Sequence, residues 1–283
     1  MREHANRVRW RIDLVDAPTG SILWTGTFAI RGSHNGEEDT ELVRRIAAYA
    51  VHEIDRAEWR RTRLADTGQL GPWEYFQRGR ALHGLQAWES QQQAKAMFKR
   101  ALDLDPAFTP AMAALARAYH DDCTVFHLAG DSIPRCVETA RRAVELDDLD
   151  SMAHLALSLG ACRSHDHRLA VDEGHKAIRL NPSSALAHIV SGNALSFAGK
   201  PTAGVARIKK GLALMNSYDP CASFGMQMVA RSHLTARDHG AAVKWAERSI
   251  HLRPNWAFSH FVRAGAAATL DRSGNLDRTR PRG

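Results

Sequence analysis

The chain has 283 residues, of which 44% are hydrophobic and 24% are charged, as is usual for a folded globular protein. Its 38 basic and 31 acidic residues leave a net charge of +7, which reads as spread along the chain and argues only weakly for a nucleic-acid partner. The sequence has no apolar stretch long enough to cross a membrane, no secretion signal and no closely spaced cysteine pair. These features predict a cytoplasmic protein with reduced thiols.

Two strands and a helix are the first predicted elements. Apolar residues in RVRWRIDLVD alternate with charged ones, which is typical of a half-buried strand: Val8, Trp10, Ile12 and Leu14. The turn-forming segment DAPTG follows, and then a second apolar strand that contains Trp24 and Phe28. The next segment predicts a helix with one apolar face: Leu42, Ile46, Tyr49 and Ala50.

A short phrase then recurs along the chain, as RALDLDPAF, RAVELDDLD, KAIRLNPSS and RSIHLRPNW, with a weaker copy in KKGLALMNS. The equivalent turn residues are spaced by 42, 34, 34 and 38 positions: Pro106, Asp148, Pro182, Asn216 and Pro254. A period of about 34 residues in a helix–turn–helix unit is the signature of tetratricopeptide repeats. The first spacing is longer because the second unit carries an insertion within DDCTVFHLAGDSI.

Small residues recur within each unit. With the turn residue counted as position 32, positions 8, 20 and 27 are Ser158, Ala170 and Ala177 in one unit, and Gly192, Gly204 and Gly211 in the next. Small side chains at these positions let the two helices of a unit approach closely. We expect five units between residues 72 and 254 and a sixth first helix up to residue 270. The alternative is a generic helical bundle with accidental spacing.

The order of these elements resembles a known arrangement. A hairpin LVDAPTGSILWTGTF, a helix ending near RAEWRR and repeats opening with WEYFQRGRAL are similar to the C-terminal region of bacterial class III adenylate cyclases and of CadC-type winged-helix regulators. The resemblance implies a partial TolB-like α/β segment over residues 1–62, repeats over 72–270 and a disordered tail over 271–283. The catalytic domain and the winged helix of those proteins lie upstream, and nothing in this sequence matches either.

The fold class predicted is therefore mainly α, a right-handed tetratricopeptide α-solenoid with a small N-terminal β-hairpin–helix. Two polar clusters, SHDHR at 164–168 and YHDD at 119–122, lack the converging donors that a metal site requires. No phosphate-binding glycine loop or nucleophile motif is present. We predict no catalytic residues, metal or cofactor, and a protein that is not an enzyme. A metal-dependent enzyme that uses the histidine clusters is the alternative.

The remaining candidate is the inner groove that the first helices of a tetratricopeptide array line. Positions 5, 9 and 12 are expected to face it, with mostly apolar residues at position 5. The candidate peptide-binding residues at positions 9 and 12 are Arg80, His83, Arg117, His120, Asn193 and Arg231. Arginines around an apolar middle would suit an acidic, partly hydrophobic peptide. Simple solvation of these arginines is the alternative.

These observations predict a non-catalytic protein-interaction, sensory or scaffold module that forms the distal part of a bacterial signalling regulator. Its expected partner is a protein or peptide, with self-association through the N-terminal strands and no direct nucleic-acid binding. A truncated cyclase-family protein without its catalytic domain is a further alternative.

Overall fold

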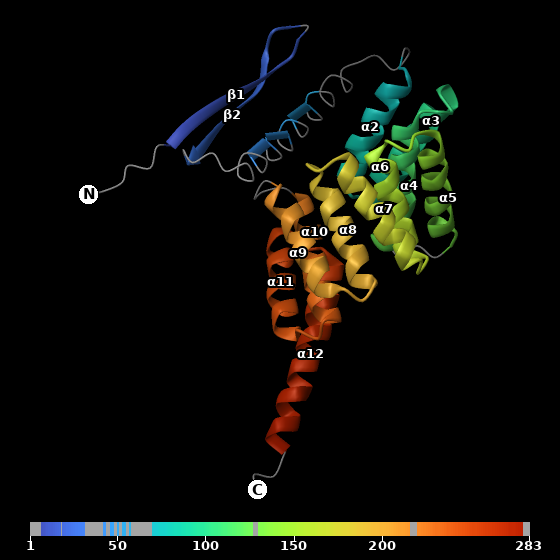
Figure 1. Ribbon diagram of the computed structural model, residues 1–283. Coiled ribbons are helices and arrows are strands. Elements are labelled where there is room, and N and C mark those ends of the chain that lie inside the picture. The colour runs from blue at the N-terminus through green and yellow to red at the C-terminus, as the bar shows by residue number, and fades with distance from the viewer. Residues whose placement is uncertain are drawn as a thin grey trace, which may run out of the picture. The chain divides into compact units, whose positions relative to one another are not determined.

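The computed structural model describes residues 7–31 except 18, parts of 42–57, and residues 70–126, 130–215 and 220–279. The chain divides into two compact units, Met1–Pro106 and Ala107–Gly283. The structure is mainly helical, as predicted, and Figure 1 shows its elements in chain order.

The first unit begins with the predicted hairpin. Strands β1 (Arg7–Val15) and β2 (Ile22–Arg31) pair antiparallel, with Trp10 opposite Phe28 and Leu14 opposite Trp24. Gly26 is buried because the rings of Trp24 and Phe28, with centroids 6.1 Å apart, cover it. The described residues between 42 and 57 are helical, in line with the predicted helix, whereas Tyr49 lies outside the described residues.

The hairpin exposes apolar side chains, since Trp10 and Ile22 are 52% and 56% exposed. The described strands form a sheet of two, so each has one edge with no β partner. A two-stranded sheet is marginally stable alone. We therefore expect amide hydrogen exchange over residues 8–28 to be faster than in the repeats for a dilute sample, and to slow as the protein concentration rises. Equal protection of hairpin and repeats in a dilute monomer would contradict this expectation.

The first helical pair also belongs to this unit. Helix α2 (Pro72–Gly84) packs on α3 (Trp88–Leu104). A Cβ atom at Gly79, position 8 of the repeat, would meet the ring of Phe98 at 2.5 Å. The predicted small residue is therefore required for Phe98 to fit between the two helices.

The second unit contains four more helical pairs and a single last helix among its described residues. Their bounds are α4 (Thr109–Thr124) with α5 (Ser132–Leu146), α6 (Ser151–Arg163) with α7 (His167–Leu180), α8 (Ala185–Phe197) with α9 (Pro201–Ala213), α10 (Pro220–Thr235) with α11 (His239–Leu252), and α12 (Ala257–Thr279). The insertion in the first of these pairs lengthens α4 and the connection to α5; residues 127–129 of it lie outside the described residues.

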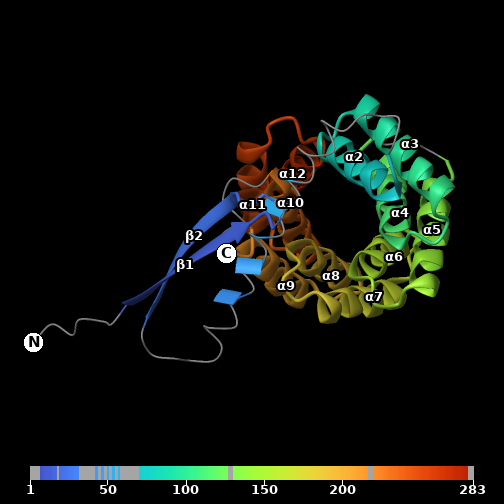
Figure 2. The same ribbon diagram turned by 90° about the horizontal axis from the view of Figure 1, so that it is seen from above.

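Within this unit the first helices of the pairs lie on the inner side of a curve and the second helices on the outer side (Figure 2). The first helices also pack on one another in succession, from α4 through α6, α8 and α10 to α12. In the four helical pairs of this unit, the residues at positions 8, 20 and 27 are all buried. This is the layout of a tetratricopeptide solenoid.

The C-terminal end differs from the sequence prediction. A disordered tail was expected from residue 271, but α12 continues to Thr279. Proline is absent from this segment until Pro281, so nothing in it removes a helical hydrogen bond.

Candidate functional site

The predicted groove residues lie on four first helices. Arg80 and His83 lie on α2 in the first unit, and the others lie in the second unit on α4, α8 and α10: Arg117, His120, Asn193 and Arg231. Within the second unit, Arg231 donates a hydrogen bond from Nη2 to Oδ1 of Asn193. His120 is buried, and its Nδ1 lies 3.0 Å from Oδ1 of Asp121.

The expected apolar groove floor is not present. The position-5 residues of the second unit are at most 2% exposed: Ala113, Leu155, Ile189 and Gln227. They are core residues, because successive first helices pack directly on one another and cover them. Position 13, near the C-terminal ends of these helices, is exposed in α6, α8 and α10, whereas position 9 is half-buried at Arg117 and Arg231 and buried at Leu159 and Asn193.

Arg231 has unusual surroundings for a cation. Its guanidinium lies 4.6 Å from the centroid of the Phe197 ring, and Nη2 lies 2.9 Å from Sδ of Met228. Burial lowers the pKa of Arg231 to about 10; the nearby Cys162 thiol opposes this shift and the Arg163 charge adds to it. Within the described part of the chain, Arg231 forms no ion pair with a carboxylate.

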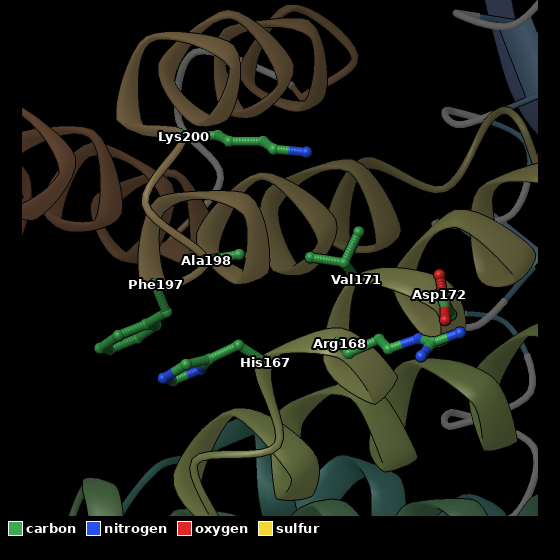
Figure 3. Close-up of a pocket in the computed structure, with 7 residues that line it drawn as sticks. All are labelled: His167, Arg168, Val171, Asp172, Phe197, Ala198 and Lys200. Carbon is green, nitrogen blue, oxygen red and sulfur yellow. The ribbon is translucent and has the colours of Figure 1, made fainter.

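Phe197 connects Arg231 to a surface pocket. The ring of His167 stacks on Phe197 with a 5.9 Å centroid separation and an interplanar angle of 3°. Both rings border a pocket of about 570 Å³, together with the neighbouring residues Arg168, Val171, Asp172, Ala198 and Lys200 (Figure 3). We call the following residues the A-edge cluster, because they lie at or near the C-terminal ends of the first helices, the A helices of the repeats: Arg163, His167, Asn193, Phe197 and Arg231.

Exposed residues complete this cluster. Arg163 ends α6 and is solvent-exposed, with Nη2 3.9 Å from Sγ of Cys123. Phe197, the last residue of α8, is 37% exposed. The cluster thus presents cationic and aromatic groups where the first helices end, and two of its members, Asn193 and Arg231, were predicted from the repeat register.

The SHDHR cluster has a structural role. His165 has a left-handed backbone (φ 62°), as Gly199 and Arg237 have at the same position of the next two pairs. Asp166 accepts a hydrogen bond from Leu169 N and thereby caps α7. The SHDHR segment is therefore a helix–helix turn. Across the described residues, no group of three or more histidines, cysteines or carboxylates could hold a metal ion.

Sequence reasoning missed a recurring histidine at position 4. Nε2 of this histidine bonds the carbonyl oxygen of the turn residue six positions earlier, at 2.7–3.0 Å, in three units: His154 to Asp148, His188 to Pro182 and His260 to Pro254. The recurrence at 154 and 188, one period apart, was the signal that could have found it. In these three units the histidine joins the repeat to the preceding turn.

Comparisons with known proteins agree on the fold. No protein-family model and no curated protein matches the sequence. The thermophilic TPR protein TTC0263 of Thermus thermophilus aligns with a TM-score of 0.54 and 18% identity over 70% of this chain and 100% of that one. The human IFIT1 dimer, solved with m7Gppp-AAAA, aligns with a TM-score of 0.63 and 15% identity over 78% of this chain and 52% of that one. At these identities the likeness shows a shared tetratricopeptide-type fold. None of the helices described is long and apolar enough to cross a membrane.

Proposed function

We propose that the chain is a non-catalytic protein-interaction scaffold whose second unit binds an acidic, partly hydrophobic peptide segment at the A-edge cluster. The observation that carries this proposal is the half-buried Arg231, which has an amide, a thioether and an aromatic ring around it but no carboxylate partner within the described residues. A carboxylate of a ligand would supply the missing negative charge.

Arg163 and Phe197 would extend the contact. Arg163 lies close enough to Arg231 to lower its pKa, so one acidic side chain, or two adjacent ones, could pair with both guanidinium groups. An apolar side chain of the same peptide would lie against Phe197 and His167 at the mouth of the pocket.

The test uses the full chain and a fluorescein-labelled peptide that carries glutamates on both sides of one phenylalanine. An exposed charge-assisted contact contributes about 1 kcal/mol. Arg163→Ala should therefore weaken binding about fivefold, and Arg231→Lys should weaken it comparably, because lysine cannot form the same paired hydrogen bonds.

The matched controls are a peptide with glutamine in place of glutamate and the substitution of an exposed arginine near the end of α7, Arg179→Ala. The glutamine peptide should bind at least tenfold more weakly, and Arg179→Ala should leave binding unchanged. Equal weakening by Arg163→Ala and Arg179→Ala would reject the site, since only the general positive field would then be acting.

One more predicted groove residue of the second unit is part of the same proposal. Arg117 is half-buried on α4, at the register position that Arg231 has on α10, and would contact a longer peptide. For Arg80 and His83 of the first unit, and for the buried His120, peptide contact stays a separate prediction from the sequence. The order of hairpin, helix and repeats supports a place in a bacterial signalling regulator. The unpaired strand edges and the exposed Trp10 and Ile22 support self-association through the N-terminal strands.

A further inference from the structure

The positive charge of the chain is concentrated in one region. Residues 167–253 contain 12 lysines and arginines and 5 aspartates and glutamates, an excess of 7 that equals the net charge of the whole chain. All other residues together are therefore neutral. The expectation that the charge is spread along the chain is wrong. It rested on the absence of long basic runs, whereas the excess of basic over acidic residues differs from repeat to repeat.

Much of this excess lies on the second helices, which form the outer side of the curve (Figure 2). We define the outer cationic face by six exposed residues of α7, α9, α11 and the turn before α9: Arg179, Lys200, Lys209, Lys210, Lys244 and Arg248. Helix α9 contains three cations and no acidic residue. The exposed acids on the neighbouring helices are Asp172 and Glu247.

Contacts show that these cations are close to one another across the helices. Nζ of Lys209 on α9 and Cζ of Arg248 on α11 lie 5.5 and 4.8 Å from the ring centroid of Trp245. At the α7–α9 side, burial lowers the pKa of His175, and the charges of Arg207, Arg179 and Lys200 lower it further, against the charge of Asp172. The face is therefore continuous over three helices.

None of the six residues forms an ion pair within the described part of the chain. Elsewhere cations are paired, as in Lys176 with Asp148 at 3.4 Å and Arg135 with Asp131 at 2.8 Å. Like charges gathered without counter-charges repel one another, so an anionic partner would stabilise this face.

The composition of the face discriminates between partners. Protein interfaces depend on buried aromatic and aliphatic anchors, and insertion into a membrane surface needs exposed apolar side chains. The face offers one half-buried tryptophan, Trp245, with cations over it. A phosphodiester backbone needs only an array of lysines and arginines, and an aromatic ring among them can stack on a base. We propose that the outer cationic face binds the phosphate backbone of a nucleic acid.

The experiment uses the full chain and a fluorescein-labelled single-stranded oligodeoxythymidine of about 20 nucleotides, titrated between about 50 and 200 mM salt. Lys209→Ala/Lys210→Ala should weaken binding about tenfold or more at the lowest salt. The slope of log affinity against log salt should become shallower by about 1.4, because two phosphate contacts are lost.

The matched control is Arg141→Ala/Arg142→Ala, which removes two exposed charges from α5 in the same unit. It should bind the oligonucleotide as the unsubstituted chain does. Thermal melts of both variants show whether each is folded, and all four side chains are exposed.

Three results would overturn the proposal: no oligonucleotide binding at the lowest salt, equal losses in the two double variants, or tighter binding of polyglutamate or anionic lipid vesicles that depends on Lys209 and Lys210. The peptide site is tested separately, since Arg163→Ala should weaken the peptide and not the oligonucleotide, and Lys209→Ala/Lys210→Ala should do the reverse.

Discussion

Gly192→Leu is expected to lower the free energy of unfolding by about 3 kcal/mol, at the upper end for overpacking. A Cβ atom at Gly192 would lie 2.6 Å from the carbonyl oxygen of Gly204 and 2.9 Å from the backbone nitrogen of Ile208. Two of the three nearest atoms therefore belong to the backbone of α9 and can move only if the whole helix moves. Urea denaturation followed by circular dichroism measures the loss.

Gly265→Leu in α12 is the matched control. It is the same substitution within a helix, but a Cβ atom at Gly265 would have no neighbour within 4 Å. Leucine has a higher helix propensity than glycine, so this variant should be as stable as the unsubstituted chain or more stable. A Gly192→Leu variant with unchanged stability would refute the close crossing of α8 and α9, and with it the repeat register.

The solenoid could be predicted from the sequence because its period and small residues record contacts that recur in each repeat. Gly192 and Gly204 are small for the same reason as Ser158 and Ala170, namely that two helices cross there. Such a pattern identifies the sides on which helices meet. It does not tell how far neighbouring helices cover the remaining surface, and so Leu155 and Ile189 were expected in a groove but are fully buried.

The candidate site was predictable only in part, for a similar reason. Arg231 and Asn193 were identified by their shared register, but their direct hydrogen bond and the contact of Arg231 with Phe197 depend on how consecutive repeats pack. His165 was assessed as a metal ligand because its backbone conformation was not evident from the sequence: two of the four equivalent turn residues in the second unit are glycines, Gly130 and Gly199, but His165 and Arg237 are not. The structure shows that His165 forms the turn between α6 and α7 and that Asp166 caps α7, so neither residue needs a metal to explain it.

A buried histidine gives the chain a pH-dependent contact. The side chain of His154 is fully buried; its Nδ1 bonds Oε2 of Glu173 and its Nε2 lies 2.9 Å from the carbonyl oxygen of Asp148. A carboxylate and a carbonyl only accept hydrogen bonds, so His154 satisfies both partners only as an imidazolium, with each ring nitrogen donating. Burial lowers the pKa of His154, but the bonds to Glu173 and Asp148 outweigh it, and the pKa is raised.

Glu173→Gln should therefore destabilise the chain most in mildly acidic solution. Because the folded-state pKa of His154 is raised, the stabilisation is fully present below the unfolded-state pKa of about 6.5 and is lost as the pH rises through the folded-state value. At pH of about 5.5 the variant should lose about 1.5–3 kcal/mol, the contribution of a charge-assisted hydrogen bond. At alkaline pH the loss should shrink to below about 1 kcal/mol, that of a neutral bond.

Urea denaturation at both pH values measures the difference, with the exposed Glu138→Gln of α5 as the control that should show no loss at either. A loss that is the same at both pH values would mean that His154 is neutral in the folded chain.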